Sequence, residues 1–277
     1  MFAIVESQPL VPNLYRMVVE APPVAAQVKP GQFVIVQAVE FGERIPLSVA
    51  DWDAEAGTLT LIFMEVGKTT SALAAKKRGD ALPTVVGPLG NPTVIEPFGS
   101  VVCVAGCYGI GSILPVARAL KAAGNRVTVA IEGRSAYLLY GREALRGHCD
   151  TLIEITRDGS RGFKGHIGRL PEILREKGVT ADRFIVNGCT FLMRRASQVF
   201  EPAGVPVIVS LNPIMIDGTG MCGVCRLTYD GKMKFACVDG PDFDGRLVDW
   251  EEFLKRRKQY VDEELIPVHH TGHTRCY

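Results

Sequence analysis

The sequence predicts a β barrel plus an α/β fold: an antiparallel barrel, then a parallel-sheet α/β domain, then a small cysteine-bearing segment. Three observations support this. Short β-prone runs fill residues 1–97, strands and helices alternate over residues 98–210, and three of the eight cysteines fall within residues 211–246. We expect residues 247–277 to form a C-terminal helix and tail. A chain of 277 residues is long enough for about two domains and a small extra unit.

The N-terminal part contains several short runs rich in β-prone residues, separated by turn signals such as Lys29-Pro30-Gly31. The runs are Leu14–Val19, Gln32–Ala38, Ile45–Ala50, Thr58–Val66 and Leu82–Val86. Strands at intervals of roughly 8–12 residues are typical of a closed or nearly closed antiparallel barrel. One short helix is expected over Ser71–Lys77.

From Val101 onward the pattern alternates between apolar strands and helices. The expected strands are Val101–Ala105, Arg126–Ile131, Thr151–Ile155, Phe184–Val186 and Val205–Ser210, and the expected helices are Ser112–Ala123, Leu170–Lys177 and Phe191–Phe200. This alternation predicts a parallel sheet covered by helices on both faces, with ligands at the carboxyl ends of the strands. A charged amphipathic helix is expected over Trp250–Glu264, packed on the body or on a partner.

Composition and charge exclude several classes of function. The net charge of +1 favours neither nucleic acid nor an anionic membrane as a partner. The uncharged stretch 97–117 is long enough to cross a bilayer, but several glycines and Pro115 interrupt it, so a buried strand, a loop and a helix start explain it better. Eight cysteines without an even framework, and an N-terminus without a basic secretory region, indicate a cytoplasmic protein.

The cysteine segment carries the most specific pattern in the chain. The spacing x4, x2 and x11 separates four candidate ligands, Asp217, Cys222, Cys225 and Cys237. A plant-type binuclear iron–sulfur cluster uses C-x4-C-x2-C and a distant fourth Cys, so Asp217 stands where the first Cys would be. Three glycines allow a tight loop whose N–H groups face the cluster: Gly218, Gly220 and Gly223.

A zinc site and a plain structural turn are the alternatives for this segment. Zinc also binds C-x2-C pairs, and the C-terminus offers further ligands in His269, His270, His273 and Cys276. However, no second C-x2-C or H-x3-H pair stands at the spacing of a zinc finger. The segment is too small to hold a core of its own without a metal.

A glycine-rich stretch from Gly106 to Gly111 lies between an expected strand and an expected helix. Such a loop places the helix N-terminus and free N–H groups at a dinucleotide pyrophosphate, although the spacing departs from G-x-G-x-x-G. After the next strand, Glu132 is suited to a ribose 2′-hydroxyl, as in NAD, and Arg134 to a 2′-phosphate, as in NADP. A tight turn and ordinary surface charge are the alternatives.

Two short motifs in the barrel region suit a phosphorylated ring compound. In Arg44 to Ser48, the Arg can neutralise a phosphate, Pro46 and Leu47 can lie against a flat ring, and Ser48 can bind its edge. The stretch Gly67 to Thr70 opens a short helix with N–H and hydroxyl donors, without the spacing of a P-loop.

The order of these parts resembles the ferredoxin–NADP reductase superfamily, on the stretches Glu43–Ser48, Val66–Thr70 and Thr156–Ser160. The added cysteine segment is similar to that of the electron-transfer subunits of dihydroorotate dehydrogenase B and of NADH-dependent ferredoxin:NADP oxidoreductase. The Asp at the first ligand position and the stretch Cys237–Trp250 look like the second type.

The resemblance implies three ligand sites. FAD is expected at Arg44, Pro46, Leu47, Ser48, Val66, Gly67, Lys68, Thr69 and Thr70. NAD(H) or NADP(H) is expected at Gly106, Gly109, Ile110, Gly111, Arg134, Ser135, Asp158, Gly188, Cys189 and Met193, with Cys189 as the candidate catalytic residue at the nicotinamide or else a small apolar filler. A 2Fe–2S cluster is expected at Asp217, Cys222, Cys225 and Cys237.

The chain departs from the reductase pattern at three places. Arg44 stands four residues before Ser48 rather than three, and Leu47 replaces the usual stacking Tyr. The Cys-Gly order of the reductases is reversed to Gly188-Cys189, and Arg157 replaces a common Asp.

The resemblance implies an electron-transfer flavoprotein subunit, in which FAD links two-electron nicotinamide chemistry to a one-electron cluster. The implied partner is a larger amidotransferase-like flavoprotein in an electron-bifurcating complex, with ferredoxin reached through that partner. The alternatives are a dihydroorotate-linked subunit and a zinc-stabilised nucleotide-binding regulator without redox chemistry.

Overall fold

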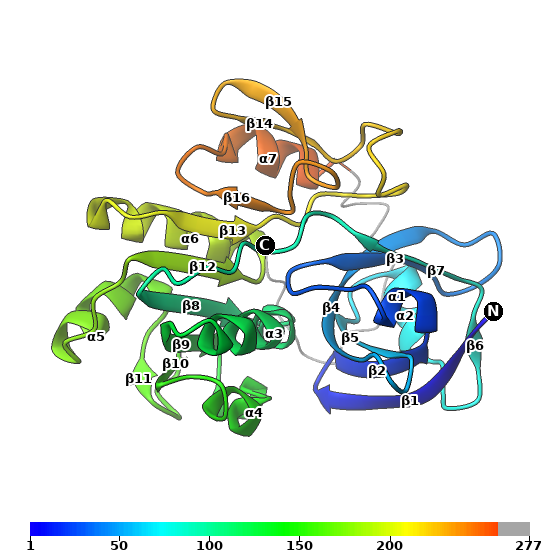
Figure 1. The fold of residues 1–277 in the computed structure, drawn as a ribbon, viewed down its shortest axis with the longest axis horizontal. Helices are drawn as coiled ribbons and strands as arrows, with labels where there is room; N and C mark the ends of the chain where they lie inside the picture. The colour runs from blue at the N-terminus through cyan, green and yellow to red at the C-terminus, as the bar shows by residue number, and fades with distance from the viewer. Residues whose placement is uncertain (260–277) are drawn as a thin grey trace.

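The N-terminal domain is a seven-stranded antiparallel sheet in a computed structural model that describes residues 1–259 (Figure 1). Its spatial order is β6-β1-β2-β5-β4-β3-β7, and the two outer strands, β6 and β7, are separated in the chain by Pro83 alone, so the sheet curls back toward itself. The elements are β1 (Phe2–Val11), β2 (Leu14–Glu20), α1 (Pro22–Ala25), β3 (Phe33–Gln37), β4 (Arg44–Asp53), β5 (Thr58–Met64), α2 (Lys68–Ala74), β6 (Ala81–Leu82) and β7 (Thr84–Leu89).

Alternating residues divide each barrel strand between two faces. In β5, Leu59, Leu61 and Phe63 are buried in the barrel core, whereas the residues between them point to the other face. The same alternation in β3 sends Val34 and Val36 inward, while Phe33 and Ile35 join a core shared with the second domain. The outer face of the barrel therefore meets the α/β domain.

The second domain is a doubly wound sheet in the order β11-β10-β9-β8-β12-β13-β16, parallel except for β16. Its elements are β8 (Ser100–Gly106), α3 (Gly109–Ala122), β9 (Arg126–Gly133), η1 (Ala136–Leu138), α4 (Arg142–Arg146), β10 (Thr151–Thr156), β11 (Phe163–Lys164), η2 (Ile167–Arg169), α5 (Leu170–Glu176), β12 (Arg183–Asn187), α6 (Thr190–Phe200), η3 (Glu201–Ala203), β13 (Val207–Ser210) and β16 (Asp242–Asp244). Helix α3 packs on one face, and α5 and α6 pack on the other. The strand order reverses between β8 and β12, and ligands of such sheets bind at the carboxyl ends of the strands there.

The C-terminal segment is built onto the α/β domain. It contains the hairpin β14 (Arg226–Tyr229) and β15 (Lys232–Phe235), and the helix α7 (Trp250–Arg257), which begins where the Asp249 side chain accepts from two backbone N–H groups. Leu227 and Phe253 belong to the same core as the strands of the large sheet, and β16 pairs with β13. Residues 211–246 are thus continuous with the α/β sheet.

The predicted fold class is confirmed, and several elements differ from the prediction, including the short α1, α4, β11, β14 and β15, which were not predicted. The sequence pattern missed β1, whose middle carries polar residues, and β16, which is three residues long. Helix α2 begins at Lys68, earlier than the predicted Ser71, because the Thr70 side chain accepts hydrogen bonds from the Val66 and Gly67 N–H groups. The last part of the predicted helix Trp250–Glu264 lies outside the described residues. The C-terminal histidines and Cys276 also lie outside them.

Contacts on two sides of the barrel join it to the rest of the chain. Arg118 of α3 forms an ion pair of 2.8 Å with Asp51 of β4, and Gly111 of α3 packs against Ile62 of β5. On the other side, the Thr93 hydroxyl donates to Asp242 of β16 at 2.6 Å. The barrel, the α/β sheet and the C-terminal segment are held together at this contact between Thr93 and Asp242.

The Asp242 contact predicts a pH dependence of stability. Burial raises the pKa of Asp242 to about 6, although hydrogen bonds from Thr93 and Ser210 act to lower it. The Asp242 carboxyl therefore keeps its proton in the folded protein at pH values where the unfolded chain has lost it, above about pH 4. The free energy of unfolding should therefore fall as the pH rises from about 4 to 6, by roughly 2 kcal/mol. Urea unfolding across this range should show a flatter profile for Asp242→Asn than for the wild type. Equal slopes in the two proteins would contradict the assignment.

Candidate functional site

The outer face of the barrel presents one set of candidate residues. In β4, Ile45 and Leu47 pack against the barrel core, so Arg44, Pro46 and Ser48 point to the opposite face. The register pairs Pro46 with Ile35 and Ser48 with Phe33, both of which lie in the core shared with the α/β domain. The structure therefore brings Arg44, Pro46 and Ser48 together but places Leu47 on the other side of the sheet.

The second barrel motif lies beside the first. Thr69 of α2 donates a hydrogen bond of 2.6 Å to Glu43, which directly precedes Arg44. Thr70 uses its hydroxyl oxygen within the loop, where it accepts from the Val66 and Gly67 N–H groups at 2.9 and 3.0 Å. The stretches 43–48 and 66–70 thus form one surface of the barrel.

The cysteine loop packs onto this same face. Gly218 has φ +82°, and a side chain there would lie 2.8 Å from Leu89 and 2.9 Å from Ile35, so only glycine allows this approach. The Arg44 guanidinium is close enough to lower the pKa of Asp217. The loop that carries the candidate ligands is therefore next to Arg44 and Pro46.

Asp217 is held in place by its own loop. Its Oδ2 atom accepts hydrogen bonds from the Thr219 hydroxyl, from the Thr219 N–H at 3.0 Å and from the Met221 N–H at 3.4 Å. These bonds, led by that of the Thr219 hydroxyl, hold the pKa of Asp217 below its usual range. All of them use Oδ2, which leaves Oδ1 as the atom suited to bind a metal.

The thiols of Cys225 and Cys237 form a buried pair, with their Sγ atoms 3.2 Å apart. Burial and the neighbouring Cys225 raise the pKa of Cys237 to about 12, so a metal has to displace protons here. Cys222 is exposed at the edge of the same loop. A pair of protein ligands is what each iron of a binuclear cluster takes, and the adjacent thiols of Cys225 and Cys237 suit one such iron.

The glycine loop lies at the switch point of the second sheet. A side chain at Gly109 would lie 2.2 Å from the Asn187 carbonyl oxygen, and one at Gly188 would lie 3.0 Å from the Gly106 carbonyl oxygen. The loops after β8 and β12 therefore cross in backbone contact. Ile110 and Met193, two further predicted nucleotide contacts, are buried in the two cores of this domain.

Tyr108 and Asn212 link the crossing loops, and the sequence pattern did not identify either residue. The Tyr108 hydroxyl donates to the Gly188 carbonyl at 3.0 Å, and Asn212 donates to Tyr108 while accepting from Thr190. Burial raises the pKa of Tyr108, and the nearby Cys189 thiol adds to this effect. Cys189 therefore stands at the start of α6, beside Tyr108.

The end of β9 does not support the ribose role predicted for Glu132. One of its carboxylate oxygens accepts from the Ile167 N–H at 2.6 Å, and the other accepts from Arg157 at 3.3 Å. The residue is only 8% exposed. The Glu132 carboxylate is thus taken up by hydrogen bonds within the protein, to Ile167 and Arg157. Arg134 is exposed at the same edge.

Ser135 and Asp158 meet through Ser160. The Ser135 and Ser160 hydroxyl oxygens are 3.2 Å apart, and Asp158 accepts from the Ser160 hydroxyl at 2.6 Å. These hydrogen bonds lower the pKa of Asp158 to about 2. Three of the predicted nucleotide contacts, Arg134, Ser135 and Asp158, therefore lie at one edge.

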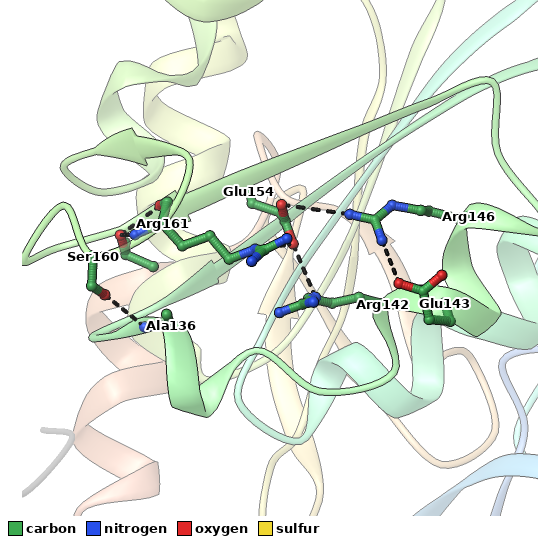
Figure 2. Close-up of polar contacts among 8 residues, drawn as sticks. Ala136, Arg142, Glu143, Arg146, Glu154, Ser160 and Arg161 are labelled. Carbon is green, nitrogen blue, oxygen red and sulfur yellow. Dashed lines mark hydrogen bonds and ion pairs between the residues drawn. The ribbon is translucent and has the colours of Figure 1, made fainter.

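Figure 2 shows the polar contacts that hold this edge. Glu154 of β10 forms ion pairs of 3.0 to 3.8 Å with Arg142, Arg146 and Arg161. The Glu154 side chain is only 13% exposed, and its three partners connect the turn after β10 to α4.

Comparison with known proteins identifies the family. Residues 212–249 match the iron–sulfur cluster binding domain of dihydroorotate dehydrogenase B. The chain is 44% identical over 264 residues to the dihydroorotate dehydrogenase B (NAD(+)), electron transfer subunit homolog of Thermotoga maritima, covering 95% of this chain and 93% of that one. The chain belongs to the family of dihydroorotate dehydrogenase B electron transfer subunits.

Solved structures and further relatives agree with this family. The structure of an NADH-dependent reduced ferredoxin-NADP oxidoreductase matches with a TM-score of 0.91 and 43% identity over 95% of both chains. The electron transfer subunit of Desulforamulus reducens is 33% identical over 249 residues, 87% of this chain and 94% of that one. A ferredoxin NADP+ reductase from Neisseria gonorrhoeae with bound FAD and NADP shares the fold alone, with a TM-score of 0.60, 16% identity, and 73% and 90% coverage.

Membership of this family confirms the resemblance on which the sequence interpretation depends. The chain is an oxidoreductase electron-transfer subunit with a ferredoxin reductase-like fold and a C-terminal iron–sulfur binding segment. The zinc alternative for the cysteine segment is therefore set aside. Among the helices of residues 1–259, none has the length and hydropathy to cross a membrane.

Proposed function

We propose that this subunit moves electrons between NAD(H) and a 2Fe–2S cluster through FAD. The observation that carries the proposal is the meeting of three segments on the outer face of the barrel. Gly218 of the cysteine loop packs on Ile35, and Gly111 at the start of α3 packs on Ile62. The exposed Ser48 of β4 is close to Ile62 of β5. Its neighbour Val49 pairs across the sheet with Leu61, the residue before Ile62. A flavin at Ser48 would thus have the nucleotide loop on one side and the cluster loop on the other.

Each group has a defined set of residues in this proposal. Arg44 and Lys68 bind the FAD diphosphate, and Pro46 and Ser48 bind its ring. FAD, when bound, converts a hydride into single electrons. The loops after β8 and β12 orient the nicotinamide, and Cys189 lies beside it.

The cluster ligands divide into two pairs. Cys225 and Cys237 already lie together, and Asp217 and Cys222 come from the other part of the loop, so each pair would hold one iron of a bound cluster. Asp217 contributes a carboxylate that its loop keeps ionised. A carboxylate differs from a thiolate in softness, so this ligand tunes the potential of the cluster.

We further propose that a larger amidotransferase-like flavoprotein docks at the cluster loop in a cytoplasmic, electron-bifurcating complex that serves ferredoxin. Ile216, Met221 and Val238 are apolar residues of this loop region that are 47%, 88% and 43% exposed, beside the exposed Cys222. Such residues suit a protein contact through which electrons leave the cluster. The 43% identity to the NADH-dependent reduced ferredoxin-NADP oxidoreductase, over 95% of both chains, supports this complex.

The proposal is tested by anaerobic titration of the purified protein with NADH and, in parallel, with NADPH. Loss of flavin absorbance, followed by the electron paramagnetic resonance signal of a reduced binuclear cluster, is the expected result for NADH. A protein whose flavin and cluster both stay oxidised in excess NADH and NADPH would contradict the proposed function.

A further inference from the structure

Tyr140 reaches from the segment after β9 to the glycine loop. Its hydroxyl oxygen accepts a hydrogen bond from the Gly111 N–H at 2.9 Å, and it lies 3.1 Å from the Cys107 carbonyl and 3.2 Å from the Tyr108 carbonyl, to which it donates. Cys107 has φ +52°, a backbone conformation that is uncommon for a residue with a side chain. The Tyr140 hydroxyl thus binds backbone groups before and within the first turn of α3, and it supports the strained backbone of Cys107.

The hydroxyl group keeps its proton at neutral pH. Burial raises the pKa of Tyr140, so the phenol can donate to a carbonyl while it accepts from Gly111. The ring itself lines an apolar cavity of about 150 Å³ with Ile62, Ile110 and Leu145, between the barrel and the α/β domain. A phenylalanine ring at this position would keep those contacts and lose only the hydrogen bonds.

The other end of the same segment lies at the edge formed by Arg134, Ser135 and Asp158. The Ala136 N–H donates to the Ser160 hydroxyl at 2.8 Å (Figure 2). Residues 134–140 therefore run from this edge to the start of α3, with a hydrogen-bonded anchor at each end. An extended dinucleotide bound at the switch point has its adenosine near the first anchor and its diphosphate near the second.

We propose that Tyr140 is a positioning residue for the nicotinamide nucleotide. It holds the loop 106–111 in the conformation that receives the diphosphate, and it ties that loop to the segment that holds the adenosine. This inference depends on the proposed function, since it assigns a residue to the nucleotide site. It adds a residue that the glycine motif does not contain and whose hydroxyl binds the backbone of the loop.

The test compares Tyr140→Phe with Tyr229→Phe in the holoprotein, with FAD and iron contents matched. Tyr229 lies in β14, outside the segment 134–140, with its ring against Phe243, and no hydrogen bond of its hydroxyl is found within residues 1–259. Calorimetric titration with NAD+ and NADP+ is expected to give a Kd about tenfold higher for Tyr140→Phe, as the loss of buried hydrogen bonds implies. Tyr229→Phe should bind as the wild type does.

Stopped-flow reduction by NADH separates positioning from general damage. The half-saturating NADH concentration should rise for Tyr140→Phe, while the limiting rate of flavin reduction stays unchanged. Equal nucleotide affinity in wild type and Tyr140→Phe would overturn the inference alone, as would a fall in limiting rate at unchanged half-saturation. A wild-type protein that binds neither nucleotide would overturn the proposed function and the inference with it.

Discussion

Replacing Cys237 by alanine is expected to remove the iron–sulfur cluster and to stop electron transfer at the flavin. The Cys237 thiol is 2% exposed, and its Sγ atom lies 3.2 Å from that of Cys225, so the two are suited to hold one iron together. Without this thiolate one iron loses half of its protein ligands. The iron content should fall from about two per chain to near zero, with loss of the paramagnetic signal after reduction.

Cys149→Ala is the matched control for this variant. Cys149 is partly buried against a different core, beside α3 and β9, and it lies outside the cysteine loop. The Cys149→Ala variant should keep the iron content of the wild type. Both variants should keep FAD, because the barrel surface at Arg44 and Ser48 is unchanged. A Cys237→Ala protein that retains about two irons and the wild-type signal would show that this thiol is not a ligand.

Replacing Gly109 by alanine is expected to destabilise the α/β domain strongly and to abolish nucleotide binding. The added Cβ would lie 2.2 Å from the Asn187 carbonyl oxygen and 2.4 Å from its carbon, which are backbone atoms of β12 that cannot turn away. Either α3 or the end of β12 has to move. We expect a loss of about 3 kcal/mol in the free energy of unfolding, measured by urea denaturation, because overpacking against backbone is at the costly end of such changes.

Gly147→Ala provides the control for the same chemical change. Gly147 has φ −66°, and the nearest atom to its added Cβ is 3.5 Å away, so alanine fits without strain. Its unfolding free energy should stay within about 0.5 kcal/mol of the wild type. Equal stability of the two variants would contradict the close packing of the loops after β8 and β12.

The sequence predicts those parts of the fold that depend on local pattern. The alternation of strands and helices after Val101 follows from apolar periodicity, and the glycines of the 106–111 loop mark the turn between β8 and α3. The cysteine spacing indicates the cluster segment without any structure, because ligands from one loop must be close in the chain. These features are local. The strands, the helices and the glycine turn are found in the structure, and the family match over residues 212–249 supports the cluster segment.

Other parts depend on contacts between distant residues and leave no local signal. The three-residue strand β16 exists because it pairs with β13, and nothing in its own residues distinguishes it from a turn. Glu132 has the residue type and position of a ribose ligand, but the later Arg157 and Ile167 take up its carboxylate. Leu47 is one residue from Pro46 and Ser48, yet strand alternation turns it into the barrel core. Tyr140 likewise reaches the glycine loop from more than twenty residues away in the chain.

The most direct test of the central claim is a visible spectrum of anaerobically purified protein, with flavin, iron and zinc counted on the same sample. We expect flavin absorption bands, one FAD and about two irons per chain, as a binuclear cluster requires. Zinc in place of iron, in a protein without flavin, would contradict an electron path from the barrel surface at Ser48 to the cysteine loop.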